Sequence, residues 1–314
     1  MKKISVCIAC YNEEENIVPL TDKVVEVLKS ELPYYDYEIV ISDNCSEDNT
    51  RSLIREICSK NKRVKAIFNT RNFGPENSWD NCSNSTTGDC IMSIFADFQT
   101  PPELIPQFVK EWESGYKIVA GVKINSRENI LMRLVRSIYY KLIDSFSSYE
   151  NINNFCGFQL VDRSITELGR VPSKYGLHYG RGFLAHLGHK VKKIPYIQPK
   201  RRAGKSSYNF YRYWDAAMLG FTSSTKGGLR IATFSGMIMG TISFIIAVIY
   251  LVLKLLYWDS FNAGYAPLII GVFLLGSFQL FFIGLLGEYI MAINTRQMKW
   301  PPVVEEERIN FEKT

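Results

Sequence analysis

Two stretches of this 314-residue sequence lack charge entirely, since residues 231–253 and 260–287 contain no Asp, Glu, Lys or Arg. A helix rises about 1.5 Å per residue, so the first stretch reaches roughly 35 Å, enough to cross a hydrocarbon core about 30 Å thick. Two helices buried in a large core are the alternative, although the second stretch is long for that role. The sequence predicts two transmembrane helices, over about 231–253 and 264–288, joined by a tight hairpin.

Other features that the sequence lacks narrow the function further. The apolar run after Met1 is short and leads into a polar loop, so we expect no signal peptide. No glycine-rich loop of the P-loop or Rossmann type is present, which excludes those modes of nucleotide binding. The seven cysteines are odd in number and all precede the uncharged stretches, which favours a reduced compartment over a disulfide framework. With 46% hydrophobic and 22% charged residues, the composition excludes a disordered or collagenous chain.

Positive charge is concentrated just before the first uncharged stretch. Residues 181–230 carry eleven Lys or Arg against one acidic residue, Asp215, and Arg296 and Lys299 follow the second stretch. Positive-inside counting predicts an inner or plasma membrane protein whose N-terminal part and C-terminus are cytoplasmic. Anionic lipid explains this charge better than nucleic acid, so we expect the lipid bilayer as a partner and no nucleic acid.

Short β-branched runs alternate with helical patterns over the first hundred residues. This alternation predicts an α/β fold made of βαβ units with a mostly parallel sheet. The expected strands are Ile4 to Ala9, Tyr37 to Ser42, Val64 to Asn69 and Asp89 to Phe95. The expected helices are Glu14 to Lys29, Asn49 to Ser59 and Glu76 to Ser85.

Polar clusters follow four of these strands at the points where they end. The carboxyl ends of parallel strands meet at one edge of a sheet, where ligands of open α/β sheets bind. Each cluster taken alone is equally compatible with a turn or a helix cap. Their convergence predicts a ligand site at this edge, built from Tyr11-Asn12-Glu13, Asp43-Asn44, Arg71-Asn72 and Asp97-Phe98-Gln99.

An ordered series of short motifs runs through the chain: Tyr11 to Glu13, Asp43 to Thr50, Arg71 to Gly74, Gly88-Asp89 and Ala96 to Glu103. With the two C-terminal uncharged stretches, this series resembles the family 2 glycosyltransferases of GT-A fold, and within them the polyprenyl-phosphate glycosyltransferases related to dolichol-phosphate mannose synthase. The resemblance implies an inverting enzyme that transfers a hexose from a UDP-sugar, such as UDP-glucose, to undecaprenyl or another polyprenyl phosphate. The product that the resemblance implies is a lipid-linked sugar for cell-envelope glycan or O-antigen modification.

The resemblance also implies roles for individual residues. Asp97 and Gln99 match a segment that binds Mg²⁺ or Mn²⁺, and these two residues with Arg201 are the implied catalytic group. The acceptor phosphate is implied to contact Lys123, Arg133 and Arg201, although attraction to the membrane surface is the alternative role of such cations, and the one that we favour for Arg202 and Lys205. The implied nucleotide-sugar site comprises Tyr11, Asn12, Glu13, Asp43, Asn44, Arg71, Asn72, Gly74, Ala96 and Asp97.

Three positions depart from the family pattern. Phe95 replaces the first carboxylate of the usual Asp-x-Asp, Asn44 replaces the second residue of an Asp-Asp pair, and Pro75 replaces a common Lys. Fewer carboxylates weaken the case for a metal. Two alternatives therefore stay open: a transferase that acts on a lipid-linked glycan, and a non-catalytic membrane scaffold that has lost metal binding.

The expected organisation has four parts. A GT-A domain spans 1–205 and includes an interfacial amphipathic helix at about 128–146, and a juxtamembrane helix spans 206–228. The transmembrane pair lies within 229–291, and a cytosolic tail, whose acidic residues 305–307 are expected to be a solvated end, spans 292–314. The resemblance also implies a homo-oligomer, such as a tetramer.

Overall fold

The computed structural model describes residues 1–124, 152, 154–169, 184–185, 187–199, 202, 265–297 and 302–312, with short pieces between 234 and 256. The chain divides into two compact units, and the first comprises Met1–Tyr140, Tyr149–Asn209 and Lys299–Thr314. The second comprises Lys141–Ser148 and Phe210–Met298. The helix expected over 128–146 and the juxtamembrane helix expected over 206–228 lie outside the described residues.

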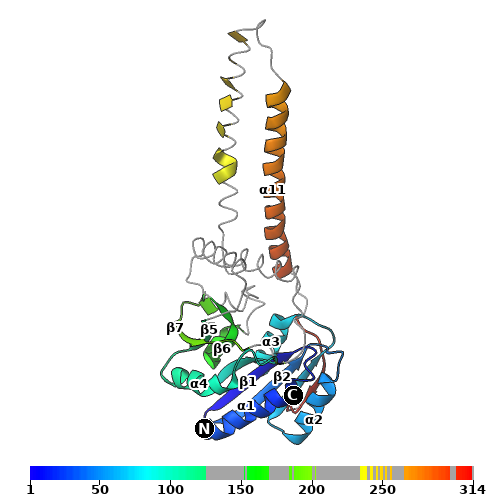
Figure 1. Cartoon of the computed structure of the whole chain (residues 1–314), viewed down its shortest axis with the longest axis vertical. Coiled ribbons are helices and arrows are strands. Elements are labelled where there is room, and N and C mark those ends of the chain that lie inside the picture. The colour runs from blue at the N-terminus through cyan, green and yellow to red at the C-terminus, as the bar shows by residue number, and fades with distance from the viewer. Residues whose placement is uncertain are drawn as a thin grey trace. The chain divides into compact units, whose positions relative to one another are not determined.

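The first unit is built on one eight-stranded sheet with the order β7-β5-β6-β4-β1-β2-β3-β8 (Figure 1). The pairs β1–β2, β1–β4, β2–β3 and β5–β7 are parallel, whereas β6 runs antiparallel to both β4 and β5, and β8 runs antiparallel to β3. The expected α/β architecture is confirmed, with a mixed sheet. The strands are β1 (Lys3–Cys10), β2 (Asp36–Asp43), β3 (Val64–Asn69), β4 (Cys90–Phe95), β5 (Ile118–Lys123), β6 (Phe155–Asp162), β7 (Val191–Tyr196) and β8 (Glu305–Ile309).

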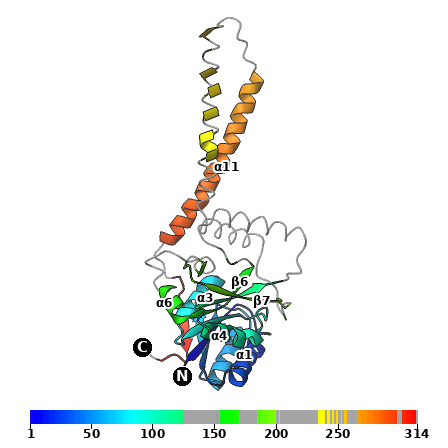
Figure 2. The same cartoon turned by 90° about the vertical axis from the view of Figure 1, so that its left-hand side faces the viewer.

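Helices cover both faces of this sheet because side chains alternate along each strand. In β1, Ile4, Val6 and Ile8 pack with residues of α1, α2 and α4 on one face, and Cys7 packs with residues of α3 and α6 on the other. Helices of both faces, including α1, α3, α4 and α6, are labelled in Figure 2. The helices are α1 (Ile17–Glu31), α2 (Thr50–Lys60), α3 (Pro75–Asn84), α4 (Ile105–Glu113) and α6 (Arg163–Gly169), and a short 3-10 helix, η1 (Pro102–Leu104), precedes α4.

The register of the parallel strands aligns the loops that follow them. Cys10 at the end of β1 pairs with Asp43 at the end of β2, and Ala9 pairs with Phe95 at the end of β4. The segments after β1, β2, β3 and β4 therefore leave the sheet at one edge, in the spatial order β4, β1, β2, β3. This is the edge at which the sequence predicts a ligand site.

The acidic tail is not a solvated end, and that expectation is wrong. Glu305–Ile309 forms β8 and pairs antiparallel with β3, so that the C-terminal segment completes the edge of the sheet. Its charged side chains reach both neighbouring helices. Glu306 and Glu307 pair with arginines of α2, and Glu305 accepts a hydrogen bond from Asn81 of α3.

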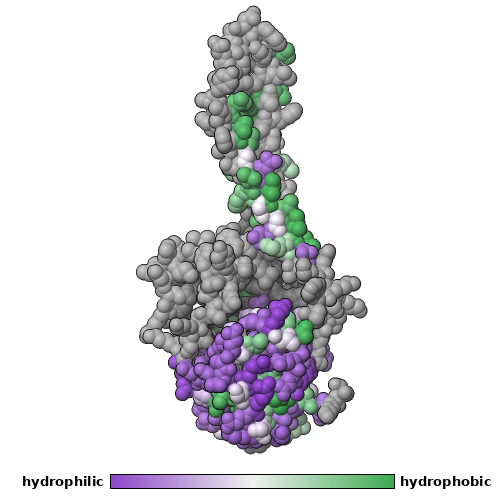
Figure 3. Space-filling view, turned by 90° about the vertical axis from the view of Figure 1, so that its right-hand side faces the viewer, coloured by the Kyte–Doolittle hydropathy of each residue, from purple (hydrophilic) through white to green (hydrophobic). Residues whose placement is uncertain are grey.

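The described part of the second unit is dominated by α11 (Tyr265–Gln297), which has 33 residues. Large apolar side chains along it are exposed, among them Leu268, Leu280 and Phe281, and the described surface of this helix is mainly hydrophobic in Figure 3. Within the described ranges, no helix combines the length and the apolar character needed to cross a membrane. Most of the expected first span, 231–253, lies outside those ranges.

Candidate functional site

The loops after β1 and β2 interlock through side chain to backbone hydrogen bonds. The backbone N–H of Asn12 donates to Ser46 Oγ at 2.9 Å, and the N–H of Glu47 donates to Asn12 Oδ1 at 2.8 Å. The N–H of Glu13 donates to Thr50 Oγ1 at 2.8 Å. The Glu13 side chain is buried and accepts a hydrogen bond from Asn16 at the start of α1. Asn12 and Glu13, both predicted as donor-site residues, thus help to set the shape of the two loops.

Three non-glycine residues in these loops have a left-handed backbone. Asn12, Cys45 and Phe98 have φ values of 54°, 64° and 61°, and they follow β1, β2 and β4 respectively. A left-handed conformation is costly for a bulky aromatic residue, and such strain is concentrated at functional sites. The three strained residues support the placement of the site at this edge of the sheet.

Asp43, the last residue of β2, is the most buried carboxylate of the site, with 0% of its surface exposed. Its Oδ2 accepts the N–H of Ser46 at 3.2 Å and lies 3.3 Å from Nε of Arg51. Oδ1 is buried, and within the part of the chain that the structure describes no donor meets it in hydrogen-bond geometry. Burial raises the pKa of Asp43, and the contacts with Ser46 and Arg51 only partly offset that effect. A buried acceptor without a donor costs free energy, which an N–H group of a ligand would recover.

Asn44 links the loops after β2 and β3. Its Nδ2 donates to Asn72 Oδ1 at 3.0 Å, and its Oδ1 accepts from the N–H of Phe73 at 3.0 Å and from Asn69 Nδ2 at 3.2 Å. A carboxylate at position 44 could not donate to Asn72, which gives a physical reason for Asn in place of the usual second Asp. Asn72 also accepts the N–H of Gly74, whose φ of 89° suits glycine at this turn.

The loop after β4 is held in a compact turn. The N–H of Phe95 donates to Thr100 Oγ1 at 2.8 Å, and the N–H of Gln99 donates to Asp97 Oδ1 at 3.1 Å. Gln99 Oε1 accepts from Gln198 Nε2 at 2.7 Å, which joins this turn to the segment after β7. The turn follows Phe95, which pairs with Ala9 near the end of β1, and it buries Ala96.

Arg202 lies in the same neighbourhood. Its guanidinium is 5.3 Å from the centroid of the Phe98 ring, within the range of a cation–π contact. We expected Arg202 to serve mainly in attraction to the membrane surface, but the structure places it against the loop that carries Asp97. It is therefore a candidate for contact with a phosphate group, a use for which arginine is well suited.

A divalent metal at this loop would have few protein ligands. Phe95 stands where the family pattern has its first carboxylate, and its ring packs beside Gly157 of β6, where an added Cβ would lie 3.4 Å from Phe95 Cζ. Among the described residues, no group of three or more His, Cys, Asp or Glu side chains could hold a metal ion. The oxygen ligands that remain are the carboxylate of Asp97 and the amide oxygen of Gln99, which here also accepts from Gln198 Nε2. Mg²⁺ commonly binds through one or two carboxylates together with substrate phosphates, so this pair fits a metal shared with a diphosphate.

The remaining predicted site residues differ in how the structure treats them. Tyr11 follows β1 and is half-buried, and Arg71 is exposed, with its guanidinium 4.0 Å from the centroid of the Phe73 ring. Lys123 ends β5, which runs parallel to β4 because both are antiparallel to β6, and so it leaves the sheet at the same edge. Arg133 and Arg201 lie outside the described residues.

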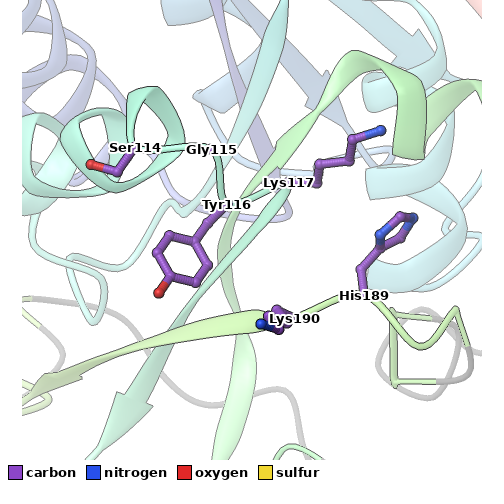
Figure 4. Close-up of a pocket in the computed structure, with 6 residues that line it drawn as sticks. All are labelled: Ser114, Gly115, Tyr116, Lys117, His189 and Lys190. Atoms are coloured by element: carbon purple, nitrogen blue, oxygen red, sulfur yellow. The ribbon is translucent and has the colours of Figure 1, made fainter.

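A cavity of about 370 Å³ lies elsewhere, between the ends of α4 and the starts of β5 and β7. It is at the opposite edge of the sheet from the four loops, because it precedes the two strands rather than follows them. Figure 4 shows its side chains without a common direction, since Tyr116 and Lys117 point to different sides. Polar groups converge at the edge where the loops after β1, β2, β3 and β4 leave the sheet, which we call the loop edge. This edge is therefore the better candidate for the functional site.

The sequence reasoning missed Arg51, which contacts Asp43 from the first turn of α2. One local signal was present: a cation in the first turn of a helix is unfavourable to the helix dipole, so a compensating contact is expected there. The compensating partners of Arg51 could not be identified without the fold, because one of them, Glu306, is distant in sequence.

Comparisons with known proteins identify the family of the chain. Residues 5–169 match Glycosyl transferase family 2. The chain is 32% identical over 303 residues to a prophage bactoprenol glucosyl transferase homolog of Escherichia coli (strain K12), covering 96% of this chain and 98% of that protein. It is 31% identical over 292 residues to the bactoprenol glucosyl transferase of Shigella phage SfX, covering 93% and 94%.

One solved structure adds support for the fold alone. A crystal structure of a mycobacterial protein superposes with a TM-score of 0.50 at 15% sequence identity, covering 71% of this chain and 73% of that chain. The family match and the end-to-end similarity to the two transferases are the stronger findings. From them it follows that this chain belongs to glycosyl transferase family 2, whose members are glycosyltransferases.

Proposed function

We propose that this enzyme transfers glucose from UDP-glucose to a polyprenyl phosphate at a membrane surface. The observation that carries the proposal is the similarity, over more than nine-tenths of both chains, to proteins named bactoprenol glucosyl transferase. The loop edge contributes a buried carboxylate, a strained set of turns and nearby cations, which suit a nucleotide-sugar donor.

Asp43 is the proposed contact for the base. Uracil presents an imino N–H between two carbonyl groups, and a carboxylate oxygen is a strong acceptor for such a donor. Asp43 Oδ1 has no donor among the described residues, so a hydrogen bond from the base would satisfy it. Because Asp43 is fully buried, binding includes a local movement of the side chains that cover it.

The diphosphate is proposed to lie over the loop that carries Asp97. Asp97 and Gln99 would hold Mg²⁺ or Mn²⁺ there, and the ion would neutralise negative charge on the departing diphosphate. Arg202, stacked on Phe98, would add a cation that does not depend on the metal. This second cation supports activity in a site with one carboxylate fewer than the family pattern.

The acceptor needs positioning more than deprotonation. The second pKa of a phosphate monoester is about 6, so its oxygen is already anionic at neutral pH. This oxygen attacks the anomeric carbon, the bond to UDP breaks with its electron pair leaving on UDP, and the configuration at that carbon inverts. We assign Lys123, Arg133 and Arg201 to hold the acceptor phosphate, since a fixed orientation lowers the barrier of such a reaction.

Membrane association is part of the proposal. The relatives are named for bactoprenol, a lipid carrier, and the uncharged stretches at 231–253 and 260–287 are long enough to anchor the chain in a bilayer. The exposed apolar side chains of α11 favour contact with lipid over contact with water. We therefore retain two transmembrane helices and a cytoplasmic catalytic unit as proposals, together with a homo-oligomer.

Transfer by the purified full chain tests the proposal. The chain in mild detergent is incubated with undecaprenyl phosphate and radiolabelled UDP-glucose, UDP-galactose, UDP-N-acetylglucosamine or GDP-mannose, with Mg²⁺, Mn²⁺ or chelator. We expect an organic-extractable product from UDP-glucose that depends on the metal, and little product from an Asp97→Asn variant of equal thermal stability. Absence of product from every donor would refute the proposal.

A further inference from the structure

Arg51 connects the C-terminal strand to the candidate base contact. It lies in the first turn of α2, and its guanidinium reaches two carboxylates that are far apart in sequence. One of its terminal nitrogens donates to Glu306 Oε2 of β8 at 2.5 Å, while its Nε lies 3.3 Å from Asp43 Oδ2. The three side chains form a series of contacts from the edge strand, where Glu306 is 54% exposed, to the fully buried Asp43.

The contacts of Arg51 with Glu306 and with Asp43 are not equivalent. The contact with Glu306 has hydrogen-bond geometry, whereas Nε of Arg51 donates to no acceptor of the described residues in such geometry, despite its short distance to Asp43. Arginine usually pairs with a carboxylate through two parallel hydrogen bonds. Here a terminal nitrogen of Arg51 donates to Glu306 instead, and no described residue donates to Asp43 Oδ1 in hydrogen-bond geometry.

Aromatic packing supports this orientation. The guanidinium groups of Arg51 and Arg55 lie 5.1 Å and 4.4 Å from the centroid of the Phe68 ring, which belongs to β3. A guanidinium over an aromatic face is attracted to the ring, which limits how far it can move away from it. The ion pair with Glu306 of β8 then directs a terminal nitrogen of Arg51 towards the edge strand.

We propose that Glu306 is a positioning residue of the donor site, which keeps the terminal nitrogens of Arg51 from pairing with Asp43 and so leaves one carboxylate oxygen to accept from the imino group of uridine once the side chains that cover it move. The inference rests on the proposed function, because it assigns the base contact to Asp43. The C-terminal strand is then a part of the nucleotide site as well as an edge of the sheet. Without Glu306, the guanidinium of Arg51 is free to pair with both oxygens of Asp43, and the base then has to displace it.

The chain offers a matched control for this contact. Arg55, one helical turn after Arg51, pairs with Glu307 at 2.7 Å and stacks on the same ring, but no ion pair links it to Asp43. Loss of Glu307 therefore removes a similar exposed ion pair between α2 and β8. A general loosening of the edge strand would affect both variants equally.

The test compares Glu306→Gln with Glu307→Gln in the full chain. Competition against a labelled UDP-sugar measures the affinity for uridine and for UDP, and steady-state transfer measures KM and kcat. We expect Glu306→Gln to weaken uridine and UDP binding by the same factor, about threefold to fivefold, which is the range for one exposed ion pair. We expect KM for the donor to rise with little change in kcat, and Glu307→Gln to behave as the wild type.

A second pair of variants tests whether Glu306 acts through Arg51. In an Arg51→Met background the fork is absent, so Glu306→Gln should have no further effect on uridine affinity. Equal effects of Glu306→Gln and Glu307→Gln, an effect on UDP but not on uridine, or an unchanged effect in the Arg51→Met background would each overturn the inference. If the wild-type chain binds no uridine nucleotide at all, the proposed function itself fails, and the inference fails with it.

Discussion

Replacement of Asp43 by asparagine should change which base the enzyme prefers. The substitution keeps the shape of the side chain, so the fold is preserved, but it turns one acceptor oxygen into an NH₂ donor. The amide oxygen is fixed on the Oδ2 side, because the N–H of Ser46 donates there at 3.2 Å and Nε of Arg51 lies 3.3 Å away. The new NH₂ group therefore takes the place of Oδ1, the oxygen without a partner.

The size of the effect follows from this geometry. A buried hydrogen bond to a charged group contributes about 1.5–3 kcal/mol, so its loss should weaken UDP binding by about 10-fold to 150-fold. Cytosine presents an unprotonated ring nitrogen where uracil presents its imino N–H, and this nitrogen can accept from the amide of Asp43→Asn. Binding of CDP should accordingly stay constant or improve while binding of UDP falls.

Isothermal titration of the full chain with UDP, CDP and GDP measures these changes, and thermal unfolding of both proteins serves as the control for folding. The reasoning is refuted if UDP and CDP lose affinity by the same factor, or if UDP binding does not change. The first result would point to a general disturbance of the loops, and the second would remove Asp43 from the base site.

Three further predictions concern other parts of the catalytic unit. Burial alone would raise the pKa of Glu38, but hydrogen bonds from groups that include Lys65 and Lys3 lower this pKa to about 2. Glu38 therefore stabilises the fold by about 2–3 kcal/mol above pH 4.5, and this contribution disappears as the pH falls towards 2. Glu38→Gln should flatten that part of the stability–pH curve, measured by denaturant unfolding, and an unaltered slope would contradict the assignment. Phe95→Asp should lower the Mn²⁺ concentration for half-maximal transfer by about tenfold, since a second carboxylate strengthens ion binding, and no decrease would place the metal elsewhere. Arg202→Ala should reduce kcat/KM for the donor by about tenfold, with poor rescue by Arg202→Lys, because lysine lacks the planar fork; full activity of the alanine variant would exclude a role at the diphosphate.

Much of the first unit could be predicted from local sequence patterns. The expected strand from Val64 to Asn69 matches β3 in both bounds, and the other strands and helices of the first hundred residues agree with the structure within a few residues. Apolar alternation and helical periodicity are local properties of the chain, so they survive without knowledge of the tertiary structure. The convergence of the polar clusters at one edge was also predictable, because parallel strands leave a sheet in the same direction.

Features that depend on distant residues were not predictable in this way. The run Glu305 to Glu307 looks like a solvated tail by composition, and it becomes a strand only because the edge of β3 is open to it and arginines of α2 face its carboxylates. The sequence around Arg202 favours a membrane-facing cation, and only the tertiary structure shows that its guanidinium lies over the Phe98 ring.

The sequence by itself determined the α/β class, the family and the edge of the sheet at which we propose the site, because these follow from periodicity and from ordered motifs along the chain. Only the tertiary structure decided which side chains meet there. Asp43, Arg51 and Glu306 come from a strand end, a helix and the C-terminal strand, and their alignment depends on how those elements pack. Pairing between distant charges is a property of the packed fold, since no local pattern specifies which partner a carboxylate will find.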